Sequence, residues 1–494
     1  MSWEPVIGLE IHVQLKTETK MFCRCRVGFG AGENTQTCPV CLGFPGALPV
    51  MNRRAVEWTI KLGLALDCEI AEHAVFARKN YFYPDLPKGY QISQYDLPSC
   101  INGKVILPSA EGDRVIGIVR AHLEEDAAKT VHVGGRTGRI GGADYSLVDF
   151  NRGGTPLVEI VTEPDLREPG QAREWLQLLR STIKAIGASD VNMEEGSLRC
   201  DANISLRPAG SDELGTKTEL KNMNSFRFIE RGIAAEIERQ REILDSGGAV
   251  SQDTLHFDPR DGSLTSLRSK EYAHDYRYFP EPDLVPLAPT DEMLASARES
   301  LPELPAERRE RYLTQLELGR KEADQLAFTK ELGDYLDAGL LALEGQDGGP
   351  KVTPQRFVGL VLGELAGLLS AEDIGVEELD TIKLTPPKLA EIGNLQAAGG
   401  ISSSSARKLM RLVLAEGGDP AEIVEREGLG QMEDSGELEA IVEAALEAEP
   451  DAAQKVRDGN MKAVGPLVGF VMKETKGRAD GGEVTRLIRE KLGA

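Results

Sequence analysis

The 494-residue sequence has few aromatic side chains and a deficit of positive charge. Phe, Trp and Tyr make up 5% of it, which argues against a protein that holds single strands by serial base stacking. Lys and Arg number 57 against 80 Asp and Glu, a formal net charge of −23. This charge argues against a nonspecific DNA coater, whose affinity comes from phosphate neutralisation, although it permits a local basic patch.

Long apolar runs and an export signal are also missing. The longest apolar stretches, such as 357–363, stop well short of the ~18 residues that a membrane span needs. The first residues, MSWEPVIGLEIHVQLK, mix acids and a histidine with apolar residues, unlike a signal or transit peptide. With seven unevenly scattered cysteines, we expect a soluble protein of the reducing cytoplasm, with neither membrane nor DNA as partner.

The N-terminal part of the sequence has a period of two. Apolar and polar residues alternate over 7–15 and again over 197–207, and charged residues alternate over 217–221. Successive side chains of a strand point to opposite faces, so these segments are predicted to be half-buried strands of a largely antiparallel sheet. The polar face of this sheet is dense in charge, which is unusual for a merely solvated face.

Two long helices are expected to flank the sheet, which makes the fold class α+β. One runs over 171–186 and ends at Gly187, and the other runs over 226–244 after an N-cap at Asn224 or Ser225. The sequence after residue 302 has a helical period.

Two composition shifts divide the chain into three predicted domains. The first, 279–290, has four prolines in twelve residues and indicates an extended connector. The second, the GGISSSS segment 399–405, indicates a flexible junction. The predicted domains are a sheet-rich 1–290, an all-helical 291–400 and a small helical tail 401–494.

Four of the seven cysteines form a C-x-C-x12-C-x2-C pattern at Cys23, Cys25, Cys38 and Cys41. Two close pairs of thiolates across a loop match a tetrahedral structural zinc site. The alternatives are buried free thiols or, in a secreted protein, disulfides. Because four protein ligands leave no open position, the expected role is structural.

Carboxylates gather at two places in the sequence. Glu124, Glu125 and Asp126 are consecutive, and Glu10 and His12 lie on one face of the first predicted strand. Carboxylate-rich sites suit Mg²⁺, which keeps waters and bridges substrate phosphates. The alternatives are a solvated acidic turn and a structural histidine.

The segment 78–96, RKNYFYPDLPKGYQISQYD, combines Arg78, Lys79 and Lys88 with four tyrosines. It could place cations against phosphates and aromatic rings against a base or ribose, or it could be a packed surface loop. Neither a phosphate-binding G-x4-GK[ST] loop nor a G-x-S-x-G motif occurs.

Eight motifs in order closely resemble the B subunits of the tRNA-dependent amidotransferases, the family of the GatCAB complex. They are GLEIHVQL, CPVCLGFPGALPV, RKNYFYPDLPKGYQISQYD, HLEEDAAK, DFNRGGTPLVEI, MEEGSLRCDANIS, ELKNMNSF and SKEYAHDYRYFPEPDL. The resemblance covers the whole chain and includes a YqeY-like tail. It implies a cradle-shaped kinase domain with the zinc loop, a helical domain and the tail.

The resemblance also implies a function. In this family the B subunit uses ATP and Mg²⁺ to phosphorylate the side-chain carboxylate of Glu or Asp esterified to tRNA, and ammonia then displaces phosphate. Glu10, His12, Glu124 and Glu125 would bind Mg²⁺ and ATP. Lys79 would stabilise phosphate charge, and Arg152, Asp201 and Glu219 would line the reacting centre.

The implied partners are the amidase of the GatCAB complex, which releases ammonia from glutamine, the small subunit of the same complex, and misacylated tRNA. Whether Glu-tRNA(Gln), Asp-tRNA(Asn) or both are substrates stays open. Two alternatives are a non-catalytic tRNA-binding scaffold and an amide ligase for a small molecule. The scaffold would not need Glu10, His12 and a carboxylate run beside Lys79, and the small molecule would not need the helical and tail domains.

The tail has an asymmetric charge. Residues 401–454 carry 4 basic and 13 acidic groups, whereas residues 455–494 carry 9 basic and 5 acidic groups. Because the resemblance assigns tRNA contact to the tail, we expect its basic end to bind RNA phosphates without reading bases. The alternative is a solvated helix.

Overall fold

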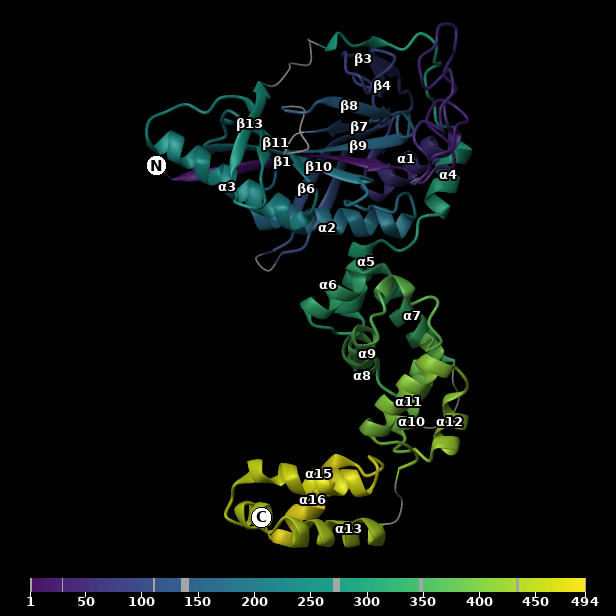
Figure 1. The fold of residues 1–494 in the computed structure, drawn as a ribbon, viewed down its shortest axis with the longest axis vertical. Coiled ribbons are helices and arrows are strands. Elements are labelled where there is room, and N and C mark those ends of the chain that lie inside the picture. Colours follow the sequence, from purple (N-terminus) through teal and green to yellow (C-terminus); the bar gives the residue numbers. More distant parts are fainter. Residues whose placement is uncertain are drawn as a thin grey trace. The chain divides into compact units, whose positions relative to one another are not determined.

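The computed structural model describes residues 2–28, 30–109, 112–134, 142–269, 276–345, 350–431 and 435–493. The chain divides into two units, Met1–Glu307 and Arg308–Ala494, which are described separately. The described part of the first unit is built around a large sheet, and the described elements of the second unit are helices (Figure 1).

Nine strands among the described residues form the large sheet, in the order β13-β12-β11-β10-β1-β9-β6-β5-β2. Their bounds are β1 (Trp3–Gln14), β2 (Glu69–Ile70), β5 (Cys100–Leu107), β6 (Arg114–Glu125), β9 (Pro156–Thr162), β10 (Leu198–Pro208), β11 (Thr218–Met223), β12 (Asp253–Phe257) and β13 (Leu264–Ser269). Neighbours are antiparallel except for the parallel pair β11 and β12. The predicted α+β class with a largely antiparallel sheet is confirmed.

The alternation of β1 places its apolar side chains in the core of the first unit. Ile7, Leu9, Ile11 and Val13 are at most 1% exposed, and they belong to one hydrophobic cluster to which three longer helices contribute most of the helical residues. These helices are α1 (Arg53–Ala65), α2 (Pro169–Ile186) and α3 (Phe226–Asp245). Figure 1 shows α2 and α3 on one side of the sheet, which leaves the polar face on the other.

The two long helices end and begin as the sequence predicts. Gly187 caps the end of α2 with a left-handed φ of 78°, a conformation that glycine adopts without steric cost. Ser225 caps the start of α3, where its hydroxyl accepts a hydrogen bond from the backbone N–H of Phe228.

The described residues of the first unit also form two small sheets. One has the order β14-β3-β4, with β3 (Phe76–Asn80), β4 (Tyr90–Gln94) and β14 (Phe279–Pro280). The other pairs β7 (Lys129–Val133) with β8 (Tyr145–Asp149). The proline-rich segment 279–290 is extended as predicted, but it runs along the first unit, because β14 pairs with β3 and Leu287 pairs with Ala74. Helix α4 (Asp291–Glu299) also packs on α1.

The helices after α4 are α5 (Pro305–Thr314), α6 (Arg320–Phe328), α7 (Lys330–Glu344), α8 (Pro354–Gly359), a π-helical turn (Leu360–Leu365), α9 (Ala366–Ala371), α10 (Pro386–Ala397), α11 (Ser403–Glu416), α12 (Pro420–Glu427), α13 (Ser435–Ala448), α14 (Pro450–Arg457), α15 (Val464–Glu474) and α16 (Gly481–Leu492). Short 3₁₀ turns lie at Val376–Glu378 and Met461–Ala463. Their buried apolar residues form two clusters, one within 312–429 and one within 438–492. No described helix is long and apolar enough to cross a membrane.

The prediction of a flexible junction at 399–405 is wrong. Helix α11 begins inside this segment at Ser403, and Ser402 is its N-cap. The Ser402 hydroxyl accepts the backbone N–H of Ser405 at 3.1 Å, and Ser402 is buried. A serine run before a helical period therefore marks a helix start here, because a serine oxygen satisfies an N–H group that the helix itself leaves unpaired.

Candidate active site on the polar face of the sheet

Side chains on the polar face of the large sheet fall into a row that crosses four neighbouring strands. In the registers of these strands, Arg199 of β10 lies opposite His12 of β1, His12 opposite Glu159 of β9, and Glu159 opposite His122 of β6. A second pairing places Glu10 of β1 opposite Asp201 of β10. Segments far apart in the sequence therefore deliver charged groups to one patch, because each strand alternates its faces.

Two groups of potential metal ligands lie in this patch and share Glu159. One is Glu10, His12 and Glu159, and the other is His122, Glu124 and Glu159. Within each group, one ligand atom per residue lies within 4.8 Å of the others. His12 Nε2 lies 3.4 Å from a Glu159 oxygen and 3.7 Å from a Glu124 oxygen. We refer to these five residues as the carboxylate–imidazole cluster.

The two histidines of the cluster have opposite pKa shifts. Burial lowers the pKa of His12, but its hydrogen bond to Glu159 and the charges of Glu159, Glu124 and Glu10 outweigh burial and raise it to about 9. Burial lowers the pKa of His122 to about 4, so that His122 is neutral at pH 7. His12 is thus protonated at pH 7, and a metal ion that binds it would have to displace this proton. His122 already has the neutral form that a metal requires.

The pKa values of the carboxylates in the cluster are also shifted in opposite directions. Burial and the neighbouring Glu159 raise the pKa of Glu124 to about 7. Burial also raises the pKa of Glu10. Glu159 is the exception, because burial would raise its pKa but the charge of His122 in its protonated form, the hydrogen bond and charge of His12, and the ammonium of Lys79 together lower it. Glu159 is therefore the carboxylate of the cluster that ionises most readily.

A cavity of about 250 Å³ opens beside the cluster and contains Lys79 of β3 in its wall. Burial lowers the pKa of Lys79, but Tyr278, Glu124 and Glu159 raise it by more, so the ammonium stays charged. Its Nζ lies 4.9 Å from the ring centre of Tyr276. The structure thus brings Lys79, Glu10, His12 and Glu124 together as the sequence predicts.

Asp201 and Glu219 lie on the neighbouring strands β10 and β11. Both carboxylates hold the ammonium of Lys221, at 2.7 Å from Asp201 and 3.3 Å from Glu219. Glu219 also accepts a hydrogen bond of 3.1 Å from the Thr254 hydroxyl. Glu219 and Lys221 line the same cavity as Lys79.

Glu125 and Arg152 lie elsewhere. Glu125 follows Glu124 in β6, so its side chain points the opposite way. It pairs with the Lys88 ammonium and accepts the backbone N–H of Ile92 at 2.9 Å. Arg152 donates to the carbonyls of Ala127 and Ala128 at 2.9 and 2.8 Å. The expectation that Glu125 joins the other carboxylates therefore fails, because consecutive strand residues cannot share a face.

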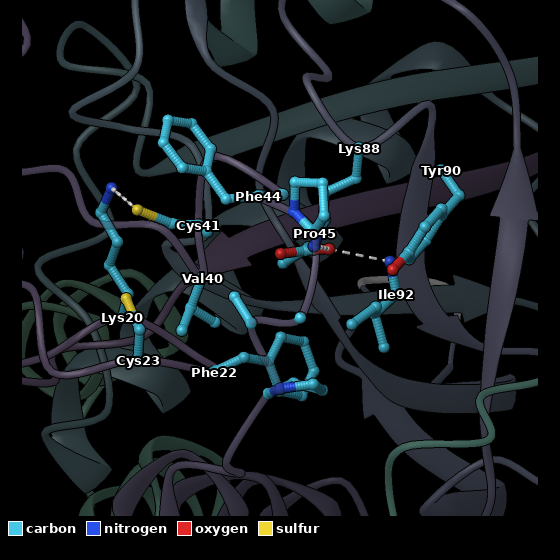
Figure 2. Close-up of a pocket in the computed structure, with 16 residues that line it drawn as sticks. Lys20, Phe22, Cys23, Val40, Cys41, Phe44, Pro45, Lys88, Tyr90 and Ile92 are labelled. Carbon is cyan, nitrogen blue, oxygen red and sulfur yellow. Dashed lines mark hydrogen bonds and ion pairs between the residues drawn. The ribbon is translucent and has the colours of Figure 1, made fainter.

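Glu125 instead lines a second cavity of about 210 Å³ beside the cysteine loop. Figure 2 shows Lys88, Tyr90 and Ile92 on one side of this cavity and Lys20 and Cys41 on the other. Apolar residues of the loop, among them Phe44 and Pro45, lie between them.

The four cysteines of the loop lie together. The Sγ atoms of Cys23, Cys25, Cys38 and Cys41 are all within 4.8 Å of one another, and those of Cys38 and Cys41 are 3.9 Å apart. Four sulfurs at ~2.3 Å from one zinc ion lie at comparable mutual distances in a tetrahedron. A hydrogen bond from Cys23 lowers the pKa of Cys41 to about 4, and Lys20 Nζ lies 3.7 Å from its sulfur. The donor set therefore fits a structural metal.

Comparison with known proteins identifies the family. Residues 5–295 match the family model "GatB/GatE catalytic domain", and residues 349–492 match "GatB domain". The chain belongs to the GatB family. It is similar to proteins named as the B subunit of aspartyl/glutamyl-tRNA(Asn/Gln) amidotransferase from Thermobifida fusca, with 51% identity over 99% of this chain and 94% of the relative, and from Persephonella marina, with 46% identity over the full length of both. The resemblance of the sequence motifs is confirmed.

The catalytic domain of this GatB family member spans both metal-ligand sets. Residues 5–295 contain the cysteine loop and every member of the carboxylate–imidazole cluster. The cluster combines carboxylate oxygens, which suit Mg²⁺, with imidazoles, which suit softer divalent ions. Its donor set therefore fits a divalent cation.

Sequence reasoning missed Glu159 and His122 of the cluster. Glu159 is the single charged residue of the strand PLVEIVT, where a buried charge needs a partner. His122 lies two residues before Glu124, on the same face of β6. The lone charge of PLVEIVT and the spacing of His122 and Glu124 can both be seen in the sequence. Neither pattern predicts which strands are neighbours in the sheet.

Proposed function

We propose that this chain transfers the γ-phosphoryl group of ATP to the side-chain carboxylate of Glu or Asp esterified to tRNA, and that ammonia then converts the product to Gln-tRNA or Asn-tRNA. The observation that supports this proposal is the carboxylate–imidazole cluster, placed beside the Lys79 ammonium in one cavity. The name of the relatives, which are B subunits of aspartyl/glutamyl-tRNA(Asn/Gln) amidotransferase, agrees with it.

The chemistry explains why a kinase step precedes amidation. A carboxylate is a poor acceptor for ammonia, because its oxygen is a poor leaving group. In the first step a carboxylate oxygen bonds to the γ-phosphorus, the bond to the β–γ bridging oxygen breaks, and ADP leaves. In the second step the ammonia nitrogen bonds to the acyl carbon, and inorganic phosphate leaves with the bonding electron pair. Catalysis of the first step consists mainly of positioning and of stabilising charge on the phosphoryl oxygens.

Each part of the proposed site has one task. The five residues of the carboxylate–imidazole cluster would hold Mg²⁺, with His12 giving up its proton, and the ion would supply positive charge against the phosphates. Lys79 adds a second positive charge from the cavity wall. Asp201 and Glu219 fix the Lys221 ammonium at the edge of the cavity. Arg152 donates to the carbonyls of Ala127 and Ala128 and lines neither of the two cavities, so this scheme gives it no task.

Aromatic rings at the same cavity suit the base or ribose of a nucleotide. Tyr95 and Tyr278 are stacked, with ring centres 4.2 Å apart and planes 9° apart, and both line the cavity. We propose that this pair forms a wall of the ATP subsite.

The alternative of a non-catalytic scaffold is disfavoured by the same geometry. Docking a partner does not require buried carboxylates, which are costly to bury even where His12 and Lys79 compensate part of their charge. Glu124 and Glu159 are 3% and 7% exposed and belong to one ligand group. A reaction that requires a bound divalent cation explains why these carboxylates are buried together.

We further propose that the chain works in the cytoplasm as part of a heterotrimer, together with the amidase and the small subunit of the GatCAB complex, and with zinc in the cysteine loop. The amidase supplies the ammonia. The relatives are named as one lettered subunit of an amidotransferase, which supports an assembly of several different chains.

The tail is proposed to bind tRNA. Arg486 is paired with Glu483 and Glu490, and Lys491 is paired with Glu439 and Glu443, so these cations of α16 are compensated within the tail. Lys473 and Lys476, near the end of α15, are therefore the better candidates for phosphate contacts. Changing both to Ser should raise KM for aminoacyl-tRNA and reduce its salt dependence by about one charge per lost contact. An unchanged salt slope would remove the tail from the tRNA site.

The decisive experiment measures ADP formation by the assembled complex with Glu-tRNA(Gln) or Asp-tRNA(Asn) and ammonium. We expect ADP only when a misacylated tRNA and Mg²⁺ are both present. Lys79→Met should abolish ADP formation, whereas the matched change Lys104→Met, at a lysine whose side chain is 63% exposed, should not. Amidation without ATP would overturn the proposal.

A further inference from the structure

One buried side-chain amide in the wall of the proposed active site has an N–H donor that is unpaired within the described part of the chain. Gln94, at the end of β4, is 2% exposed and lines the same cavity as Lys79 and Glu159. Its Nε2 atom is buried and has no acceptor among the residues that the structure describes. A buried donor without an acceptor is destabilising, so a native protein that keeps one has a reason for it.

The orientation of this amide is fixed by its other end. Gln94 Oε1 accepts hydrogen bonds from the backbone N–H of Ser99 at 3.1 Å, the Ser99 hydroxyl at 2.8 Å and the backbone N–H of Leu123 at 3.1 Å. Backbone N–H groups only donate, so the atom that faces them must be the oxygen. The amide therefore cannot flip to satisfy Nε2, and its N–H groups remain for the cavity.

The surroundings of Gln94 favour an anionic acceptor. Arg120, which also lines the cavity, has a buried Nε without an acceptor among the described residues. Lys79 adds a full positive charge to the same wall. Three carboxylates, Glu10, Glu159 and Glu219, line the same cavity, and a divalent cation bound with the substrates would neutralise them. Two spare donors next to a retained ammonium then suit an oxygen that carries negative charge.

We propose that Gln94 Nε2 donates a hydrogen bond to an anionic oxygen of the bound substrates and so positions them beside the carboxylate–imidazole cluster. This inference rests on the proposed function. The oxygen belongs either to the phosphoryl groups of ATP or to the side-chain carboxylate of the aminoacyl-tRNA. Gln94 is thereby a substrate-positioning residue.

Two substitutions test the donor in the assembled complex. Gln94→Glu keeps an oxygen for Ser99 and Leu123 but turns the donor into an acceptor. Gln94→Met removes the donor without adding charge and also removes this oxygen, so the two variants share only the loss of the donor. Gln91→Glu is the matched control, because Gln91 lies on the same strand, is absent from the cavity lining, and its Nε2 already donates to the Glu125 carbonyl at 2.7 Å. Thermal denaturation and zinc content report whether each variant is folded.

The measurements are KM for misacylated tRNA and Kd for ATP, the second without tRNA so that ATP is not consumed. We expect one of them to rise at least about tenfold in both Gln94 variants and to stay within about twofold in Gln91→Glu, because a hydrogen bond to a charged group is lost. A rise in KM alone assigns the acceptor to the substrate carboxylate, and a rise in Kd assigns it to the phosphoryl groups. Unchanged constants in both variants, or a rise in Gln94→Glu alone, would overturn the inference.

Failure of this inference can be told from failure of the proposed function. The wild-type complex must form ADP in response to misacylated tRNA if the proposed function holds, whatever the Gln94 variants do. If the wild type forms none, the proposed function fails, and the Kd of the variants for ATP still decides whether Gln94 contacts phosphoryl oxygens.

Discussion

The cysteine loop and the carboxylate–imidazole cluster are both sets of potential metal ligands in one domain, but they are assembled in different ways. The four thiols lie within a stretch of nineteen residues, Cys23 to Cys41. The cluster combines strands that begin at Trp3, Arg114 and Pro156. Local spacing therefore creates the first site, whereas strand register creates the second.

The difference extends to what each site can do. The thiols offer four protein ligands, which fill a tetrahedral ion and leave no position for a substrate. The cluster borders a cavity of about 250 Å³ that also contains Lys79. A closed site stabilises the fold, and an open site can act on a ligand, so the comparison predicts that damage to the two sites has separable effects.

Among changes to the two sets of potential metal ligands, the largest effect is expected from Glu159→Gln. Glu159 belongs to both ligand groups and compensates the charges of His12 and Lys79. Removing its charge should lower the rate of tRNA-dependent ADP formation by roughly 10²- to 10³-fold, the usual cost of losing one group that stabilises developing charge. The rate is measured under saturating ATP and aminoacyl-tRNA.

Glu213→Gln is the control, because Glu213 is an exposed glutamate outside the cluster. Its rate should stay at the wild-type value. Equal losses in the two variants, or an active Glu159→Gln, would show that the cluster is not the catalytic part of the comparison.

The same contrast explains how much could be predicted from the sequence. The alternation of β1, β10 and β11 places Glu10, His12, Asp201 and Glu219 on the correct faces, because the period of a strand is a local property. The partners Glu159 and His122 depend on which strands pair and in which register. No local pattern contains that information.

Two errors have local causes. Three consecutive acids suggest one shared cation site, which groups Glu125 with Glu124, whereas β6 continues through Glu125 and separates their faces. The serines of 399–405 resemble a linker by composition, but Ser402 caps α11. In both cases the local pattern misplaces an element end by a few residues, and the function of each side chain changes with it.

The second prediction concerns the closed site. Cys38→Ser should abolish zinc binding and lower the free energy of unfolding by about 2 to 4 kcal/mol, in the upper range of single-substitution effects. Activity per folded molecule should stay near that of the wild type below the melting transition. Metal analysis and chemical denaturation measure the two quantities.

Cys68→Ala provides the control for this thiol, because Cys68 is buried outside the cysteine loop. It should keep one zinc ion per chain. Loss of catalysis in Cys38→Ser at unchanged stability would contradict the separation of the two sites.

The third prediction uses the pKa of His12 in the metal-free protein. Its value is raised on folding from 6.5 to about 9. The protonated form is favoured in the folded state, so its contribution to stability is fully present below pH 6.5 and is lost as the pH rises through 9. In EDTA, the wild type should melt a few degrees above His12→Gln at the low end of this range, and the gap should close towards the high end.

His73→Gln, at an exposed histidine, should follow the wild type throughout this range. A gap between the wild type and His12→Gln that does not vary with pH would show that His12 does not titrate against the cluster. The cysteine loop supplies the contrast, because Cys38→Ser should lower the melting temperature without closing this gap.

The smallest effect is expected from a third kind of thiol, Cys200. It lies on the apolar face of β10, is 2% exposed, and burial raises its pKa well above the usual range. A cysteine attacks as the thiolate, so a buried, protonated thiol cannot release ammonia from glutamine. Cys200→Ala should therefore cost about 1 kcal/mol of stability through lost packing and leave glutamine-dependent amidation by the complex unchanged.

The isolated chain should show no glutaminase activity, measured as glutamate release. If the isolated chain had glutaminase activity and Cys200→Ala abolished it, a thiol on the apolar face would not be inert. The division of the thiols into metal-binding and packing groups would then be wrong.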